Sequence, residues 1–214
     1  TRKESSAASD VYKRQSNARA NRRDLLEAAE RLLNVHGPTV SLRAVAQEAG
    51  VGVGTLYRHF PTRRHLLTAL LGQILEKVDA IVDGYLAEAG EPEDDDGATA
   101  SDGDLARVRW HRFATELVGV NLTVAAASLD SLDRKDLPSE DMIEAAEKTL
   151  LQRMEDVLAR ARADRLVSED LTGERFFMGL LTVSRPLLSE ERWRLPGQED
   201  WMLRTYLRGL RPQG

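Results

Sequence analysis

Residues 41–60, with the sequence SLRAVAQEAGVGVGTLYRHF, constrain the fold more than any other stretch of this chain. Ser41 directly precedes a helical repeat of apolar residues and is a favourable N-cap. The spacing of that repeat predicts a short helix over 42–49, and its members are Leu42, Val45, Ala46 and Ala49. Gly50 follows where helices often end in a left-handed residue, a conformation that glycine adopts without steric cost.

A second short helix is predicted after this glycine, with Gly52 as a weak N-cap and with Leu56 and Phe60 as its buried stripe. Two short helices joined by a glycine turn form the helix-turn-helix arrangement, which places its second helix in the major groove of DNA. The outer positions of this helix are Val53, Thr55, Tyr57, Arg58 and His59. Thr55 and Tyr57 carry hydroxyls, and Arg58 and His59 can be cationic, so this face suits phosphates and base edges. The alternative is a plain helical hairpin whose polar face is merely solvated.

Residues 20–71 resemble the N-terminal DNA-binding domain of TetR-family transcriptional regulators. The specific part of the resemblance is GVGVGTLYRHF, Gly50 to Phe60, followed by a hydroxyl and two basic residues. The segment GVGVGTLYRHFPTR and the closing LRTYLRGLRP also resemble the subgroup with SbtR-like C-terminal domains. The resemblance implies an all-α, bacterial, cytoplasmic homodimer, which is usually a repressor and releases a palindromic operator when a small molecule binds.

The resemblance also implies roles for single residues. Arg43 would reach a base or a phosphate, Val53 and Thr55 would approach base edges or backbone, and Tyr57, His59 and Arg63 would hold phosphates. Arg22 lies near the positive N-terminal end of a helix predicted from about Ala18 to His36, so its partner is either DNA phosphate or solvent. The predicted DNA-binding set is Arg22, Ser41, Arg43, Gly52, Val53, Thr55, Tyr57, Arg58, His59 and Arg63.

Three positions depart from the family pattern. Gly52 stands where many relatives have a serine N-cap, so the start of the second helix is less firmly capped. His65 stands where an acidic residue is common, so we expect Thr62 to lack the usual capping box. Val53 offers only apolar contact, for example to a thymine methyl group.

Charge and periodicity divide the chain into parts. Residues 1–75 hold 12 basic against 6 acidic side chains, whereas residues 76–214 hold 18 against 29, so an acidic body would orient the basic part toward DNA. We predict a disordered or artefactual segment over 1–17, a helix-turn-helix domain over 18–65, and a helical ligand-binding and dimerisation domain over 66–214.

The second domain shows only helical periodicity, which predicts an all-α fold. A long stripe follows Thr62, and the further predicted helices span 105–129, 139–166, 171–185 and 198–210. Residues 91–104 hold seven acidic and no basic side chains, which predicts a flexible loop; the spacing of a calcium loop is missing. We expect neither metal nor cofactor, and the absence of cysteine excludes disulfides and thiolate sites.

The distribution of apolar residues on the predicted helices indicates what this chain binds. The last two predicted helices are apolar on more than one side, which predicts pairing with a second copy; the alternative is that both pack fully within one chain. An effector pocket is predicted from apolar residues and one amide on the helices predicted over 105–129, 139–166 and 171–185, namely Trp110, Phe113, Asn121, Met154 and Phe177, although each taken alone reads more simply as core. No apolar run approaches the ~20 residues that cross a bilayer, and no signal-peptide pattern is seen.

Two other classes of function remain open. A helical enzyme would need a nucleophile, base or metal constellation, whereas the four histidines are scattered and HExxH is absent. A protein-binding adaptor would keep the helix-turn-helix fold without reading DNA.

Overall fold

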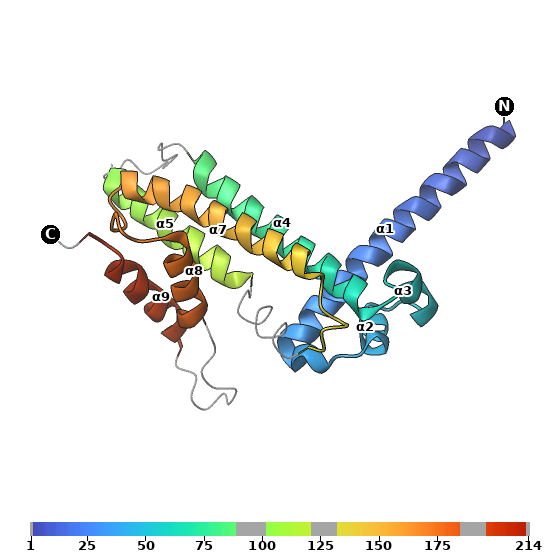
Figure 1. The fold of residues 1–214 in the computed structure, drawn as a ribbon. Helices are drawn as coiled ribbons and strands as arrows, with labels where there is room; N and C mark the ends of the chain where they lie inside the picture. The colour runs from blue at the N-terminus through green and yellow to red at the C-terminus, as the bar shows by residue number, and fades with distance from the viewer. Residues whose placement is uncertain (1, 89–101, 121–131, 185–195, 213–214) are drawn as a thin grey trace. The chain divides into compact units, whose positions relative to one another are not determined.

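The computed structural model describes residues 2–88, 102–120, 132–184 and 196–212. Every regular element within these ranges is helical, as the periodicity predicted (Figure 1). In chain order the elements are α1 (Arg2–His36), η1 (Gly37–Thr39), α2 (Leu42–Glu48), α3 (Val53–His59), α4 (Arg63–Ala87), α5 (Asp102–Gly119), α7 (Glu140–Ala163), α8 (Gly173–Val183) and α9 (Gln198–Gly209).

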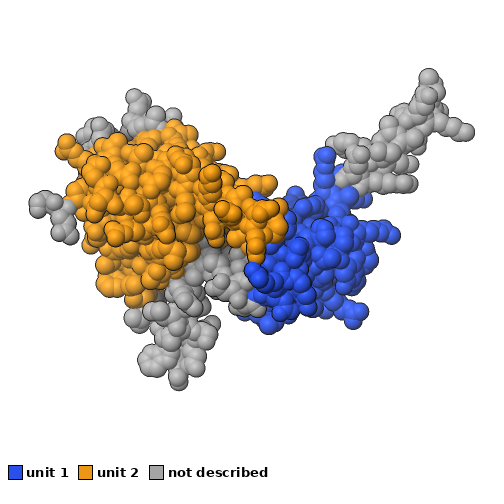
Figure 2. Space-filling model, in the orientation of Figure 1, with its two compact units in different colours: residues 1–72, 124–138 blue, residues 73–123, 139–214 orange. Residues whose placement is uncertain are grey.

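The chain divides into two compact units (Figure 2). Unit 1 consists of residues 1–72 and 124–138, and unit 2 consists of residues 73–123 and 139–214. The first stretch of unit 1 ends at Gly72, seven residues after the predicted domain boundary at residue 65. The predicted boundary also misses the return of the chain to unit 1, since that contact depends on tertiary packing. Helix α4 is continuous across the boundary, so its first part belongs to unit 1 and its remainder to unit 2.

The N-terminal segment differs from the prediction. Helix α1 begins at Arg2, not near Ala18, so the backbone over 2–17 is helical and the expected disordered segment is not observed. The segment has no proline or glycine, and half of its residues are the good helix formers Ala, Lys, Arg, Glu and Gln. A helix already nucleated by the packed residues after Ala20 extends through such residues at little cost.

Unit 1 is built around one apolar core. Leu25, Ala28 and Ala29 of α1 are completely buried, and so are Ala46 of α2 and Leu56 of α3. The remaining buried members of this cluster are Leu26, Val40, Val45, Phe60, Leu66, Leu67 and Leu70. Ala28 and Ala29 of α1 and Ala46 of α2 lie in this same buried cluster, and their small side chains allow the helices to approach closely.

The turn between α2 and α3 has the predicted chemistry. The Ser41 hydroxyl oxygen accepts a hydrogen bond from the backbone N–H of Ala44 at 3.1 Å and caps α2. Gly50 has φ +68°, the left-handed conformation that ends the helix. Gly52 is the N-cap of α3 and makes no side-chain cap. These three predictions from the sequence are confirmed.

The start of α4 is better capped than the sequence indicated. The Thr62 Oγ1 atom accepts a hydrogen bond from the His65 backbone N–H at 3.4 Å. The His65 Nδ1 atom lies 2.8 Å from the same oxygen. The imidazole therefore hydrogen-bonds with the side chain of the capping residue Thr62. In a capping box, a carboxylate at this position would instead accept from the backbone N–H of the capping residue.

Unit 2 has a core of stacked aromatic rings. The rings of Trp110 and Phe176 lie 5.1 Å apart, those of Tyr85 and Phe113 lie 4.9 Å apart, and the ring of Tyr206 stacks on Phe176 at 6.4 Å. Such pairs add about 0.5–1.5 kcal/mol each beyond their buried area. Burial raises the pKa of Tyr85 to about 12, which keeps its hydroxyl uncharged.

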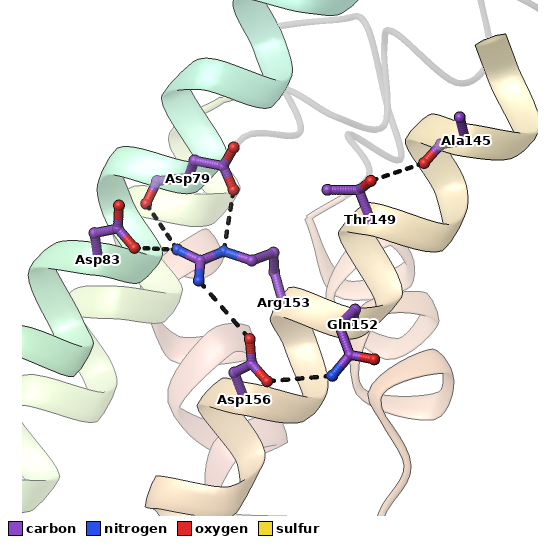
Figure 3. Close-up of polar contacts among 7 residues, drawn as sticks. All are labelled: Asp79, Asp83, Ala145, Thr149, Gln152, Arg153 and Asp156. Carbon is purple, nitrogen blue, oxygen red and sulfur yellow. Dashed lines mark hydrogen bonds and ion pairs between the residues drawn. The ribbon is translucent and has the colours of Figure 1, made fainter.

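Arginines of α7 tie it to the part of α4 in unit 2. Arg153 lies between two carboxylates of α4, with its Nε 3.0 Å from Asp79 and a second contact to Asp83 (Figure 3). One turn further toward the end of α4, Arg160 donates to the carbonyls of Leu86 at 2.9 Å and Glu88 at 2.6 Å. Arginine at a helix C-terminus satisfies carbonyls that the helix leaves unpaired.

Candidate nucleic-acid interface

Helix α3 packs against the rest of unit 1 mainly through Leu56. This is the one residue of its seven that is fully buried. Tyr57 is 50% exposed, and Arg58 is exposed as well. Val53, Thr55 and His59 are half-buried. The helix therefore presents one phenol, one guanidinium, one imidazole and one hydroxyl along its accessible faces, which are groups that bind phosphates and base edges.

The turn fixes the direction of α3. The backbone N–H of Val51 donates to the carbonyl of Ala46 at 3.0 Å, and that of Gly50 donates to Gln47 at 3.1 Å. At the far end, the N–H of Phe60 donates to the Leu56 carbonyl at 2.7 Å, and the Phe60 ring is 1% exposed. Both ends of α3 are thus held to the core, so its exposed face is rigidly placed.

Residues of the other helices flank this face. The Arg22 guanidinium carbon lies 5.0 Å from the centre of the Phe60 ring, a cation–π contact that leaves the side chain exposed. Arg43 is exposed on the first turn of α2. Ser41 is exposed, but its hydroxyl oxygen already caps α2.

Arg63 has an intramolecular role that the sequence did not indicate. Its two terminal nitrogens donate to the backbone carbonyls of Pro38 and Val40, and the side chain is half-buried. The guanidinium therefore holds the segment between α1 and α2 against the start of α4. Its predicted phosphate contact stays a prediction, and two of its five donors are already engaged.

Gly54 is a candidate interface residue that sequence reasoning missed. It is exposed on the first turn of α3, and a Cβ atom built there would meet nothing within 4 Å. Space within the protein therefore does not require glycine at this position. A bare backbone is what close approach of a large ligand would need, and the GxG spacing with Gly52 was the available signal.

The described residues predicted for an effector pocket lie in or against one apolar core, with the Trp110 and Phe113 rings 5.6 Å apart, but they do not line one common cavity. Phe113 and Met154 are buried in the unit 2 core, Trp110 lines a cavity beside α9, and Phe177 lines a separate small cavity beside α5. Asn121 lies outside the described residues. The predicted pocket therefore stays a prediction.

Two classes of feature are absent from the part of the chain that the structure describes. No helix there is both long and apolar enough to cross a membrane. No three His, Asp or Glu side chains there gather into a group that could hold a metal ion.

Part of the chain is similar to a known protein family. Residues 25–70, which include α2 and α3, match the family described as bacterial regulatory proteins, tetR family. Over 75 residues the chain is 41% identical to the HTH-type transcriptional repressor KstR of Mycolicibacterium smegmatis. This match covers 35% of the present chain and 37% of the repressor, so it spans little more than a third of either protein.

Solved structures resemble nearly the whole chain. The TetR transcription regulatory protein from Mycobacterium vanbaalenii superposes with a TM-score of 0.62 over 92% of this chain and 99% of its own, at 23% identity. The TetR-like regulator LfrR from Mycobacterium smegmatis, solved in complex with proflavine, gives a TM-score of 0.56 over 91% of this chain and 99% of its own, at 17% identity. At these identities the likeness concerns the fold.

Proposed function

We propose that this chain is a ligand-responsive transcriptional repressor of the TetR family, whose model matches residues 25–70. It binds a palindromic operator as a homodimer and is released by a small molecule, and its place of action is the cytoplasm. The observation that carries the proposal is the exposed polar face of α3, which Leu56 and Phe60 hold rigidly against the core.

DNA recognition is assigned to the residues around this face. Tyr57, Arg58 and His59 are placed to contact phosphates or base edges, and Thr55 lies half-buried beside them. Gly54 would let the backbone of α3 approach the groove. Arg22 and Arg43 supply positive charge from α1 and α2, and phosphate contacts of this kind set register and affinity without reading sequence.

A homodimer is supported by exposed apolar side chains on the last two helices. Met178 on α8 is 55% exposed, and Trp201 on α9 is 56% exposed. Large apolar side chains at the surface mark interfaces, and a two-fold dimer presents two recognition helices to a palindrome. Repression as the sign of regulation is supported by the 41% identity over 75 residues to a protein named as the transcriptional repressor KstR.

Control by a small molecule is proposed as a shift between two conformations. Helix α4 runs without interruption from unit 1 into unit 2, so a conformation favoured by ligand in unit 2 is transmitted along one rigid element. The ligand lowers operator affinity only by its differential affinity for the two conformations. The solved complex of LfrR with proflavine shows that a relative of this fold holds a small molecule.

The test is selection of bound sites from a random duplex library with the whole protein. A recovered motif with two inverted half-sites supports the proposal, provided that the variant Tyr57→Ala fails to enrich it. Asn34→Ala on α1 is the matched control, because Asn34 is exposed in the same unit and outside the proposed interface. Failure to enrich any sequence, together with a stable complex with another protein, would instead identify an adaptor.

A further inference from the structure

A cavity of about 270 Å³ lies between α5 and α9, entirely within unit 2. Four arginines line it, one from α5 and three from α9 and the residues that follow it: Arg107, Arg204, Arg208 and Arg211. Residues 76–214 hold 29 acidic against 18 basic side chains, so a gathering of arginines runs against the charge of this part of the chain. The site is separate from the proposed DNA-binding face in unit 1.

The positive charge at this cavity is only partly neutralised. Arg107 pairs with Asp104 at 2.5 Å, and Arg204 contacts Asp200. Arg208 and Arg211 have no acidic partner among the residues that the structure describes. Two guanidinium groups are therefore available to an anion, and guanidinium groups bind carboxylates and phosphates through paired hydrogen bonds.

His111 also lines the cavity and is close enough to Arg204 to be affected by its positive charge. The Nε2 atom of His111 lies 3.1 Å from an Asp200 oxygen, but this carboxylate is shared with Arg204. Burial and the charge of Arg204 lower the pKa of His111 below its ordinary value. Burial, the larger cause, disfavours a charge of either sign, whereas the contribution of Arg204 comes from the positive charge at this cavity.

The rest of the cavity wall is apolar. Trp110, Leu166 and Leu207 line it and are 3%, 4% and 6% exposed. The indole Nε1 of Trp110 is buried and finds no hydrogen-bond acceptor among the described residues. This nitrogen has no accessible surface in the cavity, so Trp110 contributes only an apolar contact to the cavity wall.

We propose that the cavity between α5 and α9 binds a small organic anion, in which a carboxylate or phosphate group meets Arg208 and Arg211 and an apolar body contacts Trp110 and Leu207. The volume lies near the lower end of ligand pockets, which begin at roughly 300 Å³, so the body is the size of one ring or a short chain. Its action as the effector would rest on the proposed function, whereas the binding itself does not.

Calorimetric titration of the whole protein without DNA tests the proposal. The probes are benzoate, phenyl phosphate, inorganic phosphate and benzamide, the last being an uncharged analogue of benzoate. We expect saturable binding of benzoate or phenyl phosphate, with the tighter of the two identifying the anionic group. Inorganic phosphate, which lacks the apolar body, and benzamide, which lacks the charge, should both bind more weakly.

Two charge-matched variants locate the site. Arg208→Gln should weaken binding on the order of tenfold, as expected for losing a hydrogen bond between charged groups. Arg175→Gln, which removes an exposed arginine of α8 that does not line the cavity, should leave it unchanged. If Arg208→Gln unfolds, Arg211→Gln takes its place, since that arginine follows the end of α9.

Three outcomes would overturn the proposal: no saturation by either organic anion at millimolar concentration, equal binding of benzamide, or equal weakening in Arg208→Gln and Arg175→Gln. Loss of operator recognition would leave this titration unaffected. Failure of the proposed function and failure of the anion site are therefore distinguishable.

Discussion

Tyr57 directly follows the completely buried Leu56 along α3, yet half of its surface is exposed. A phenol held in this way can bind a phosphate through its hydroxyl without supporting the core. We therefore expect Tyr57→Phe to weaken operator binding by about tenfold, the effect of one hydrogen bond to a charged group, with an unchanged melting temperature. Fluorescence anisotropy with the selected operator and a thermal melt measure the two quantities.

His59→Ala is the companion change, because His59 stands two residues further along the same helix and is half-buried. We again expect a loss of operator affinity that exceeds the loss of stability. Parallel losses of affinity and stability in both variants would show that these side chains belong to the core and would remove them from the interface.

Substitution of Gly54 is expected to lower operator affinity without lowering the stability of the protein. A Cβ at this position meets nothing within 4 Å, so Gly54→Ala should leave the free energy of unfolding unchanged or raise it by less than about 1 kcal/mol. The same methyl group would stand between the α3 backbone and DNA and weaken operator binding. An operator affinity equal to that of the wild type would exclude close backbone approach at this position.

At the residue scale, the sequence predicted the chemistry that depends on near neighbours. The Ser41 cap and the left-handed Gly50 involve partners within four residues, so the spacing alone was sufficient. Arg63 donates to carbonyls 23 and 25 residues away, and such a partner cannot be read from local sequence. The Arg208 and Arg211 cluster was missed for a similar reason, since its cavity forms only when α9 meets α5.

Tyr206 of α9 packs closely against Gly179 of α8. A Cβ at Gly179 would clash with the Tyr206 hydroxyl oxygen, and this hydroxyl donates to the Phe176 carbonyl at 2.9 Å. Gly179→Ala must therefore displace the tyrosine or separate the helices, and we expect a loss of about 1–3 kcal/mol, as for other overpacked sites. Chemical denaturation followed by circular dichroism measures it.

Gly84→Ala supplies the matched control for that change. Gly84 also lies within a helix of unit 2, but a Cβ there meets nothing within 4 Å. We expect this variant to gain roughly 0.5–1 kcal/mol, the usual difference between alanine and glycine inside a helix. Similar effects of the two substitutions would mean that Tyr206 moves aside freely.

Helix bounds were predictable wherever a capping residue marks them. The predicted helix over 198–210 is observed as Gln198–Gly209. The helix predicted over 105–129 is observed as Asp102–Gly119, and residues 121–129 lie outside the described part of the chain. The start of α1 was not predictable in this way, because the segment before Ala18 has no apolar stripe and its helix continues one that packing stabilises further along. Periodicity detects helices that bury a face, and it overlooks those that only extend a neighbour.

The charge of the whole molecule predicts how binding responds to salt. The basic excess of residues 1–75 stands against an acidic excess in residues 76–214, so contacts to phosphates should come from unit 1. A dimer that contacts ~6–10 phosphates should lose about 10³–10⁵ in affinity between 50 and 200 mM salt. Operator titrations across that range check this, and a flat response would contradict groove binding.

Unit 1 is completed by a segment that the chain reaches only after it has begun unit 2. Arg64 donates to the carbonyls of Arg134 and Lys135 at 3.1 and 3.0 Å, and Leu132 packs against the unit 1 core. During synthesis, domains usually fold as units from the N-terminus, but here the first unit stays incomplete on the ribosome until residue 138 has left the exit tunnel. A premature stop after α4 would therefore release a product in which unit 1, the part proposed to bind DNA, lacks the contacts of Leu132, Arg134 and Lys135.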